Sequence, residues 1–356
     1  DKIGERKNLI INGAMQVAQR GTPDTSSATS GKFVVDRFQT RADNTDNASF
    51  THAQVSDAPS GTGFSKSFKL SVDTAETTLD ANENVYIVQK IEGHNVQQLA
   101  YGSSSAQKVT LSFYVKSHQT GNFTIALYKD DSQSSVITST YTVSQSATWE
   151  KKTITFDGLT TSGIVDDNGN GLAVYWHLAA GSNYTSADST TWGNYSDARF
   201  AFGHAVNFLS STNNSFQITG VQLEVGSVAT DFEHRSFDQE VALCQRYCYV
   251  NTLNNGDNTG IHGHCFNSTT MRAMLTFPVL MRDEPTYTGN SVICRVEAAD
   301  SSPDFALSTI TMHRAPLTRP VPYTGMTVIT SSITAGQACL VVMRNNNGKM
   351  TFEAEL

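Results

Sequence analysis

The chain has 356 residues and a formal net charge of −8 at pH 7, and only 16% of its residues are charged. Nucleic-acid binding needs clustered Lys and Arg that displace counterions from phosphates, so this composition argues against a nucleic-acid partner. No segment approaches the roughly 18 consecutive apolar residues that a membrane span requires, so we expect no membrane insertion. The length predicts two core-forming units.

Alternating apolar and polar residues recur from Phe33 to Val225 and predict about ten strands, each with one buried face. Turn signals such as Asp166–Gly169 separate the strands, and one short helical stretch is expected near Asn95–Leu99. This pattern is typical of an all-β fold, and we predict a jelly-roll-like antiparallel β-sandwich over residues 31–235. Residues 1–30 are expected to form an N-terminal arm.

A short connecting helix is predicted over residues 236–250. Ser236 stands three residues before Gln239, which is the spacing of a capping box, and acidic residues follow in the first turn. Phe237, Val241, Cys244 and Cys248 fall on one face of this expected helix.

A smaller β-domain is predicted over residues 251–356. The polar stretch Asn251–Asn258 (NTLNNGDN) marks its start as a turn-rich boundary. No sequence period of 20 to 50 residues recurs, which argues against a parallel β-helix. The expected strands are Ile261–Asn267, Thr270–Phe277, Ser291–Ala298, Phe305–His313, Gly325–Ser331, Ala338–Arg344 and Lys349–Glu355.

The five cysteines are odd in number and lack the spacing of a zinc site. Cys244 and Cys248 are one helical turn apart in the predicted helix, a geometry that disfavours a disulfide and favours apolar packing. We therefore expect all five to be reduced, as in a protein assembled in a cytoplasm.

Six stretches resemble motifs of one protein family. The stretch from Thr219 to Tyr247 contains QLEVG, ATDFEHRS and LCQRY. The other five are Asn8–Gly21 (NLIINGAMQVAQRG), Asp36–Phe38 (DRF), Trp149–Phe156 (WEKKTITF), Gly171–Gly181 (GLAVYWHLAAG) and Phe277–Thr286 (FPVLMRDEPT). The chain resembles tail-fibre and related virion structural proteins of tailed phages.

This resemblance implies a homotrimeric tail fibre that is assembled in the host cytoplasm, attaches to other phage tail proteins and contacts a glycan or receptor of the host surface. Because the first residue is Asp1 and not Met, we expect the sequence to be part of a longer chain or to lack an attachment segment. The alternatives are a decoration protein attached to the head or baseplate and a glycan-degrading tailspike.

The sequence favours a non-enzymatic protein. Glycan hydrolysis needs two facing carboxylates, whereas the acidic residues here fall mostly in predicted turns. Serine-nucleophile, phosphate-loop and zinc-protease motifs are absent from the sequence. We therefore predict no catalytic residue and no cofactor.

The best candidate for ligand binding is the polar segment Tyr184–Asp197. Trp192, Tyr195 and Tyr184 are the predicted glycan-binding residues, because aromatic faces stack on sugar rings while nearby Asn and Asp bond their hydroxyls. In the alternative interpretation, Trp192 only pins its loop to the sandwich.

Two further patterns could hold metal ions, although no metal site is predicted. Asp166–Gly171 (DDNGNG) matches the opening of an EF-hand loop, but a plain turn rich in Asp and Asn explains it as well. His262 and His264 alternate on a predicted strand and would meet on the axis of a trimer, or they are ordinary surface histidines.

Overall fold

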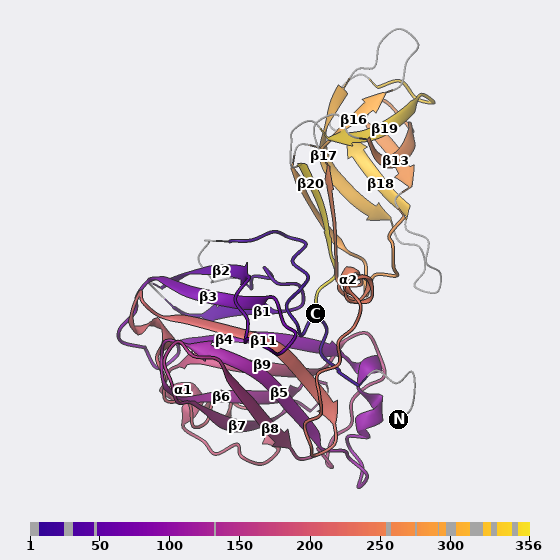
Figure 1. Ribbon diagram of the computed structural model, residues 1–356. Coiled ribbons are helices and arrows are strands. Elements are labelled where there is room, and N and C mark those ends of the chain that lie inside the picture. The colour runs from indigo at the N-terminus through magenta and orange to yellow at the C-terminus, as the bar shows by residue number, and fades with distance from the viewer. Residues whose placement is uncertain are drawn as a thin grey trace. The chain divides into compact units, whose positions relative to one another are not determined.

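The computed structural model forms two compact units (Figure 1): the sandwich unit, residues 1–240 with 356, and the C-terminal unit, residues 241–355. The expected boundary after residue 235 and the observed one after residue 240 lie in the same region. The residues that the structure describes are 7–24, 31–45, 48–131, 133–253, 258–274, 276–290, 292–296, 304–313, 323–328, 333–343 and 348–356. Within these ranges, the chain has no helix with the length and hydrophobicity to cross a bilayer.

Two antiparallel sheets face each other in the sandwich unit (Figure 1), which confirms the predicted all-β sandwich. The six-stranded sheet has the order β1 (Gln39–Asp43), β4 (Asn84–Glu92), β9 (Asn170–Ala180), β6 (Gly121–Lys129), β7 (Ser135–Val143) and β10 (Gly193–Asn194). The five-stranded sheet has the order β2 (Ser49–Val55), β3 (Ser67–Thr74), β11 (Ser215–Val225), β5 (Val109–Ser117) and β8 (Glu150–Phe156).

The period-two alternation decides which side chains enter the core between the sheets. On β9, Leu172, Val174 and Trp176 belong to this core, and Tyr175 points to the outer face. The Trp176 ring meets Phe113 of β5 edge-to-face, with 6.0 Å between ring centroids, so aromatic packing joins the two sheets.

Short helices interrupt the connections between strands. The helical stretch expected near Asn95–Leu99 is present as two 3₁₀ turns, η1 (Gly93–Asn95) and η2 (Gln97–Leu99). The connection between β9 and β11 contains α1 (Ser182–Thr185), β10, η3 (Asp197–Arg199) and η4 (Phe208–Ser210). We call residues 181–206 of this connection the cover loop.

The cover loop lies on the outer face and open edge of the six-stranded sheet. The Thr138 amide of β7 donates to the Ser189 carbonyl at 2.7 Å. The Thr124 amide of β6 donates to His204 Nδ1 at 3.3 Å. These bonds attach both halves of the loop to strand residues that lie 51 and 80 positions earlier in the sequence.

Residues 8–17, within the expected N-terminal arm, pack into the sandwich. Leu9 and Ile10 belong to its core, and the Leu9 amide donates to the Leu223 carbonyl of β11 at 2.8 Å. Gly13 allows this close approach, since a Cβ atom there would lie 2.1 Å from the Val221 carbonyl oxygen. Any side chain at residue 13 would therefore push the segment away from β11.

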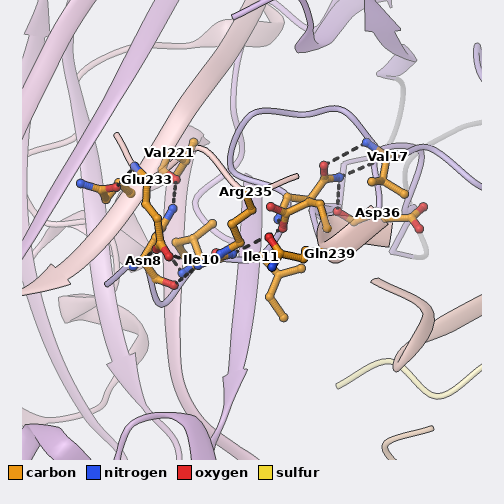
Figure 2. Close-up of polar contacts among 12 residues, drawn as sticks. Asn8, Ile10, Ile11, Val17, Asp36, Val221, Glu233, Arg235 and Gln239 are labelled. Carbon is orange, nitrogen blue, oxygen red and sulfur yellow. Dashed lines mark hydrogen bonds and ion pairs between the residues drawn. The ribbon is translucent and has the colours of Figure 1, made fainter. Parts of the chain in front are cut away.

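A network of polar contacts fixes the same segment (Figure 2). Arg235 donates to the carbonyls of Asn8 and Ile10 and pairs with Glu233 at 3.1 Å and with Glu240 at 3.5 Å. Asn12 accepts from the Val17 amide at 3.0 Å. We call this network the polar lock.

Further bonds complete the polar lock. The Asn12 amide donates to Glu240 Oε1, and the Asn12 side chain donates to the Asp36 carbonyl at 3.0 Å. The Asn8 side chain donates to the Val221 carbonyl at 3.0 Å. Three of the stretches that carry the family resemblance, 8–21, 36–38 and 219–247, therefore meet here, where their polar side chains serve folding.

The predicted capping box is present at the start of α2 (Phe237–Gln245). The Ser236 amide donates to Gln239 Oε1 at 3.2 Å, and the Gln239 amide donates to Ser236 Oγ at 3.3 Å. The prediction that Cys248 continues the apolar face of this helix is wrong, because Cys248 begins strand β12 (Cys248–Leu253). The chain leaves the helix as strand pairing starts, with the Ala354 amide donating to the Tyr247 carbonyl at 2.8 Å.

The C-terminal unit is the predicted smaller β-domain. Its closed barrel consists of β13 (Asn258–Cys265), β14 (Thr270–Met274), β18 (Tyr323–Val328), β17 (Asp304–His313), β16 (Val292–Val296) and β19 (Ala338–Met343). A three-stranded sheet adds β12, β20 (Gly348–Glu353) and β15 (Thr286–Asn290). The expected turn-rich start is partly wrong, because Asn251–Leu253 pair with β20.

Candidate functional site

A row of tyrosines crosses the outer face of the six-stranded sheet. Tyr86 of β4, Tyr175 of β9 and Tyr128 of β6 point to this face because their strand neighbours point into the core. Tyr195 of the cover loop extends the row beyond β6. Successive ring centroids are 5.1, 6.1 and 5.2 Å apart, so these four residues, which we call the tyrosine row, form a continuous line of packed aromatic rings.

The cover loop holds the tyrosine row in place. The Tyr195 amide donates to the Ser134 carbonyl at 2.9 Å, which brings its ring beside Tyr128. Phe200 packs edge-to-face on Tyr175, with 4.8 Å between ring centroids. The loop therefore adds a small aromatic core of its own on the outside of the sheet.

Three of the tyrosine hydroxyls donate to carboxylates. Tyr86 donates to Asp43 at 3.2 Å, Tyr128 to Asp130 at 3.3 Å and Tyr195 to Asp197 at 2.8 Å. Each carboxylate has two oxygens and accepts several hydrogen bonds, so the three can accept further donors from a ligand.

Electrostatics keep these hydroxyls protonated. Burial raises the pKa of Tyr128 as it does that of Tyr86, Tyr175 and Tyr195, because each phenolate would lose its hydration in this partly closed environment. Arg41 lies at the β1 end of the row, directly opposite Tyr86 in the strand pairing, and its Nε donates to Asp43 at 3.0 Å. Tyr86 first and Asp43 second raise the pKa of Arg41, so it stays a cation.

The tyrosine row presents the hydroxyl ends of its side chains to a ligand more than its ring faces. Tyr86 and Tyr175 are 6% and 8% exposed, and the rings meet edge-to-face, so neighbouring rings cover most of each face. With acceptor carboxylates beside donor phenols, this surface can exchange hydrogen bonds with a ligand that carries many hydroxyls. Flat stacking of a sugar ring fits it less well.

The structure separates the three residues predicted from the sequence. Tyr195 belongs to the tyrosine row, and half-buried Tyr184 packs against the same aromatic cluster and donates to the Asn82 carbonyl at 3.3 Å. Trp192 packs instead against the main core, edge-to-face with Tyr101, and its Nε1 donates to the Asp157 carbonyl at 2.6 Å. The sequence reasoning placed all three on one surface.

Sequence reasoning missed Tyr86, Tyr128 and Tyr175. The signal for Tyr175 was the alternation itself, since apolar Val174 and Trp176 flank it in the sequence and the residue between them must face the other side of the sheet. A second signal was the spacing Tyr-x-Asp, which occurs as Tyr128–Asp130 and again as Tyr195–Asp197. Two residues apart on an extended chain, such side chains share a face.

The two sequence patterns considered for metals have ordinary local contacts. Asp167 Oδ1 accepts from the Gly169 amide at 2.8 Å, which is an Asx turn, and Asp166 meets His94 Nδ1 at 2.6 Å. His262 and His264 are exposed on β13. In the described part of the chain, no three His, Cys, Asp or Glu side chains are grouped to hold a metal ion.

Comparisons with known proteins give distant similarities. No family model and no curated protein sequence matches the chain. The enzymatically active domain of tailspike protein 4 from bacteriophage CBA120 aligns with 61% of this chain and 21% of its own, at 12% identity and a TM-score of 0.34. The alignment thus spans about a fifth of that tailspike domain.

Two carbohydrate-binding modules align over a similar part of the chain. The family 11 module of the Clostridium thermocellum cellulase Lic26A-Cel5E aligns with 61% of this chain and 99% of its own, at 13% identity and a TM-score of 0.29. A family 16 module aligns with 61% and 99%, at 13% identity and a TM-score of 0.28. TM-scores this low say nothing of the function of this chain.

Proposed function

We propose that this chain is a non-enzymatic structural and adhesive module of a tailed-phage tail fibre, located in the virion tail, and that its tyrosine row contacts a host-surface glycan. The tyrosine row carries the proposal of glycan contact. The virion assignment draws its support from the resemblance of the six sequence stretches. Its partners are other copies of itself in a homotrimer, neighbouring tail proteins and the host surface.

The charges beside the row favour a neutral glycan. Asp43, Asp130 and Asp197 supply three carboxylates against the single guanidinium of Arg41, so the surface is acidic. A uronic or sialic acid would meet like charge here, whereas neutral sugar hydroxyls can donate to the carboxylates and accept from Tyr hydroxyls.

The same carboxylates support a binding role over a hydrolytic one. Each of the three already accepts a hydrogen bond from a tyrosine of the tyrosine row. A glycosidase instead needs one carboxylic acid with a raised pKa and a second carboxylate across the scissile bond. The polar lock likewise ties up Glu233, Glu240 and Arg235 in contacts with the backbone and with each other.

Removing hydroxyls while keeping the rings tests the glycan proposal. We expect the triple variant Tyr86→Phe, Tyr128→Phe, Tyr195→Phe to bind neutral host glycans far more weakly. Each lost hydrogen bond is worth about 1 kcal/mol, or roughly fivefold in affinity. Tyr114→Phe is the matched control, because this half-buried tyrosine lies on β5 of the other sheet.

The measurement is binding to an array of neutral and acidic glycans, with thermal unfolding to check that each variant is folded. Equal binding by the triple variant and the control, or preference for acidic glycans, would contradict the proposal. The oligomeric state is tested separately by sedimentation over a dilution series. We expect three times the chain mass of 38.6 kDa, and a monomer at all concentrations would exclude the trimer.

A further inference from the structure

A pocket of about 370 Å³ opens at the edge of the sandwich, between β7, β8 and the cover loop. This volume lies within the range of small-molecule sites in proteins. Its lining is rich in hydroxyl groups, from Thr138, Ser139 and Thr140 of β7, Thr155 of β8 and Thr190 of the cover loop. None of the residues that line the pocket belongs to the tyrosine row, so the two are distinct.

The edge of β7 offers backbone groups to this pocket. The Thr138 amide points away from β6, since it donates to Ser189 of the cover loop. In an antiparallel pair the direction of backbone groups repeats every two residues, so the amide and carbonyl of Thr140 also point to the open edge. In the described part of the chain neither group has a hydrogen-bond partner, and the Ser139 and Thr140 hydroxyls have none either.

The open edge is too short to bind a peptide strand. The Ser189 carbonyl covers the Thr138 amide on one side of Thr140, and Lys152 Nζ covers the Thr142 carbonyl on the other. Strand addition uses backbone bonds at several alternate residues, and among the described residues along this edge only Thr140 offers a donor and an acceptor together. A small ligand with its own donors and acceptors fits better.

Side chains at the borders of the pocket complete the set of polar groups. Asn122 Oδ1 accepts from Thr142 at 2.6 Å, which leaves the Asn122 amide hydrogens as donors. The Asp157 carboxylate is paired with Lys108 Nζ at 2.6 Å, so its charge is balanced. Phe202 adds a half-buried ring against which no other aromatic ring packs among the described residues.

We propose that this pocket binds a neutral monosaccharide or disaccharide unit. Sugar hydroxyls both donate and accept, which matches paired backbone groups and protein hydroxyls, and the apolar C–H face of a pyranose matches the Phe202 ring. The balanced charge at Asp157 gives no preference for an anion. Trp192 is a positioning residue for this pocket, because its indole bonds the carbonyl of Asp157 in the wall.

In the experiment, the full chain is titrated with glucose, galactose, N-acetylglucosamine and their disaccharides, and binding of each sugar is measured by ligand-observed NMR. Glucuronate is the charged comparison. We expect millimolar binding of at least one neutral sugar, weakened about tenfold by Asn122→Ala and by Thr140→Val. Thr153→Val is the matched control, since Thr153 is exposed on β8 outside the pocket. Thermal unfolding checks that all variants are folded.

The proposal is overturned if none of these neutral sugars binds, or if binding is unchanged in both Asn122→Ala and Thr140→Val. Stronger binding of glucuronate than of every neutral sugar would also overturn it. The pocket proposal does not rest on the tyrosine row. Failure of sugar binding in the pocket can therefore be distinguished from failure of glycan binding at the row. Binding lost in the triple tyrosine variant but kept in Asn122→Ala places the sugar at the row and not in the pocket.

Discussion

Replacing Arg235 with alanine should strongly destabilise the sandwich unit. The side chain is 9% exposed, and its guanidinium donates to the carbonyls of Asn8 and Ile10 while it pairs with Glu233 and Glu240. Truncation removes the donors from both carbonyls and leaves Glu240, whose side chain is 11% exposed, without its cation.

The expected loss of stability in Arg235→Ala follows from the polar groups that the substitution leaves unpaired. A buried acceptor without a donor costs about 1 to 3 kcal/mol, and breaking a buried ion pair from one side costs about 3 to 5 kcal/mol. Water can reach part of this site, so we expect a total loss of about 3 to 5 kcal/mol in the free energy of unfolding. Domains of this kind are stable by about 5 to 15 kcal/mol, so the loss is a large fraction.

Urea unfolding followed by tryptophan fluorescence measures this loss. The matched control is Arg41→Ala, because the Arg41 side chain is 51% exposed and forms a surface pair with Asp43, which is worth at most about 1 kcal/mol. Arg235→Lys should lie between the two, since an ammonium cannot reproduce the fork of donors. A loss below about 1 kcal/mol in Arg235→Ala would refute the reasoning that the polar lock holds the N-terminal segment.

Three further outcomes are expected. Burial lowers the pKa of His204 to about 4, so the unfolded chain, with an ordinary histidine pKa of 6.5, takes up a proton first as the pH falls. Stability should therefore decline between pH 6.5 and 4, by about 3 kcal/mol at most from His204, and urea unfolding of His204→Gln should show a shallower pH dependence than the parent chain. The same dependence of stability on pH in His204→Gln as in the parent chain would count against this role of His204. Trp192→Ala should lower the free energy of unfolding by about 2 to 3 kcal/mol, through lost packing on Tyr101 and the lost bond to Asp157, while array binding by the tyrosine row persists below the melting temperature. Lost array binding with unchanged stability would support a direct role of Trp192 in that contact. Incubation with capsule or lipopolysaccharide should leave the glycan chain length unchanged, and protein-dependent shortening, detected by product sizing, would contradict a non-enzymatic module.

Local signals in the sequence were sufficient to predict most strands and the start of helix α2. The capping box at Ser236 and Gln239 involves residues three positions apart, so its geometry follows from spacing alone. The end of the same helix could not be read in this way. Strand β12 begins at Cys248 because it pairs with β20, about a hundred residues later, and this pairing overrides the apolar spacing.

The candidate site was only partly predictable for the same reason. Tyr184 and Tyr195 stood out as aromatics in a polar loop, whereas Tyr86, Tyr128 and Tyr175 come from three strands whose order in the sheet is β4, β9, β6. Alternation predicts that each faces outward, but only the strand order makes them neighbours. The polar lock is equally non-local, since Asn8 and Arg235 are separated by more than two hundred residues.

The polar lock also determines how the module would carry mechanical force. Residues 8–12 are bonded to β11 and to the segment 233–240, so the two points at which the chain enters and leaves the sandwich are tied together. Tension applied between residues 8 and 240 would load these few bonds first, and apart from β11 the strands of the two sheets would stay outside the line of force. Such a module would resist stretching with its hydrogen bonds and ion pairs while its core remained packed.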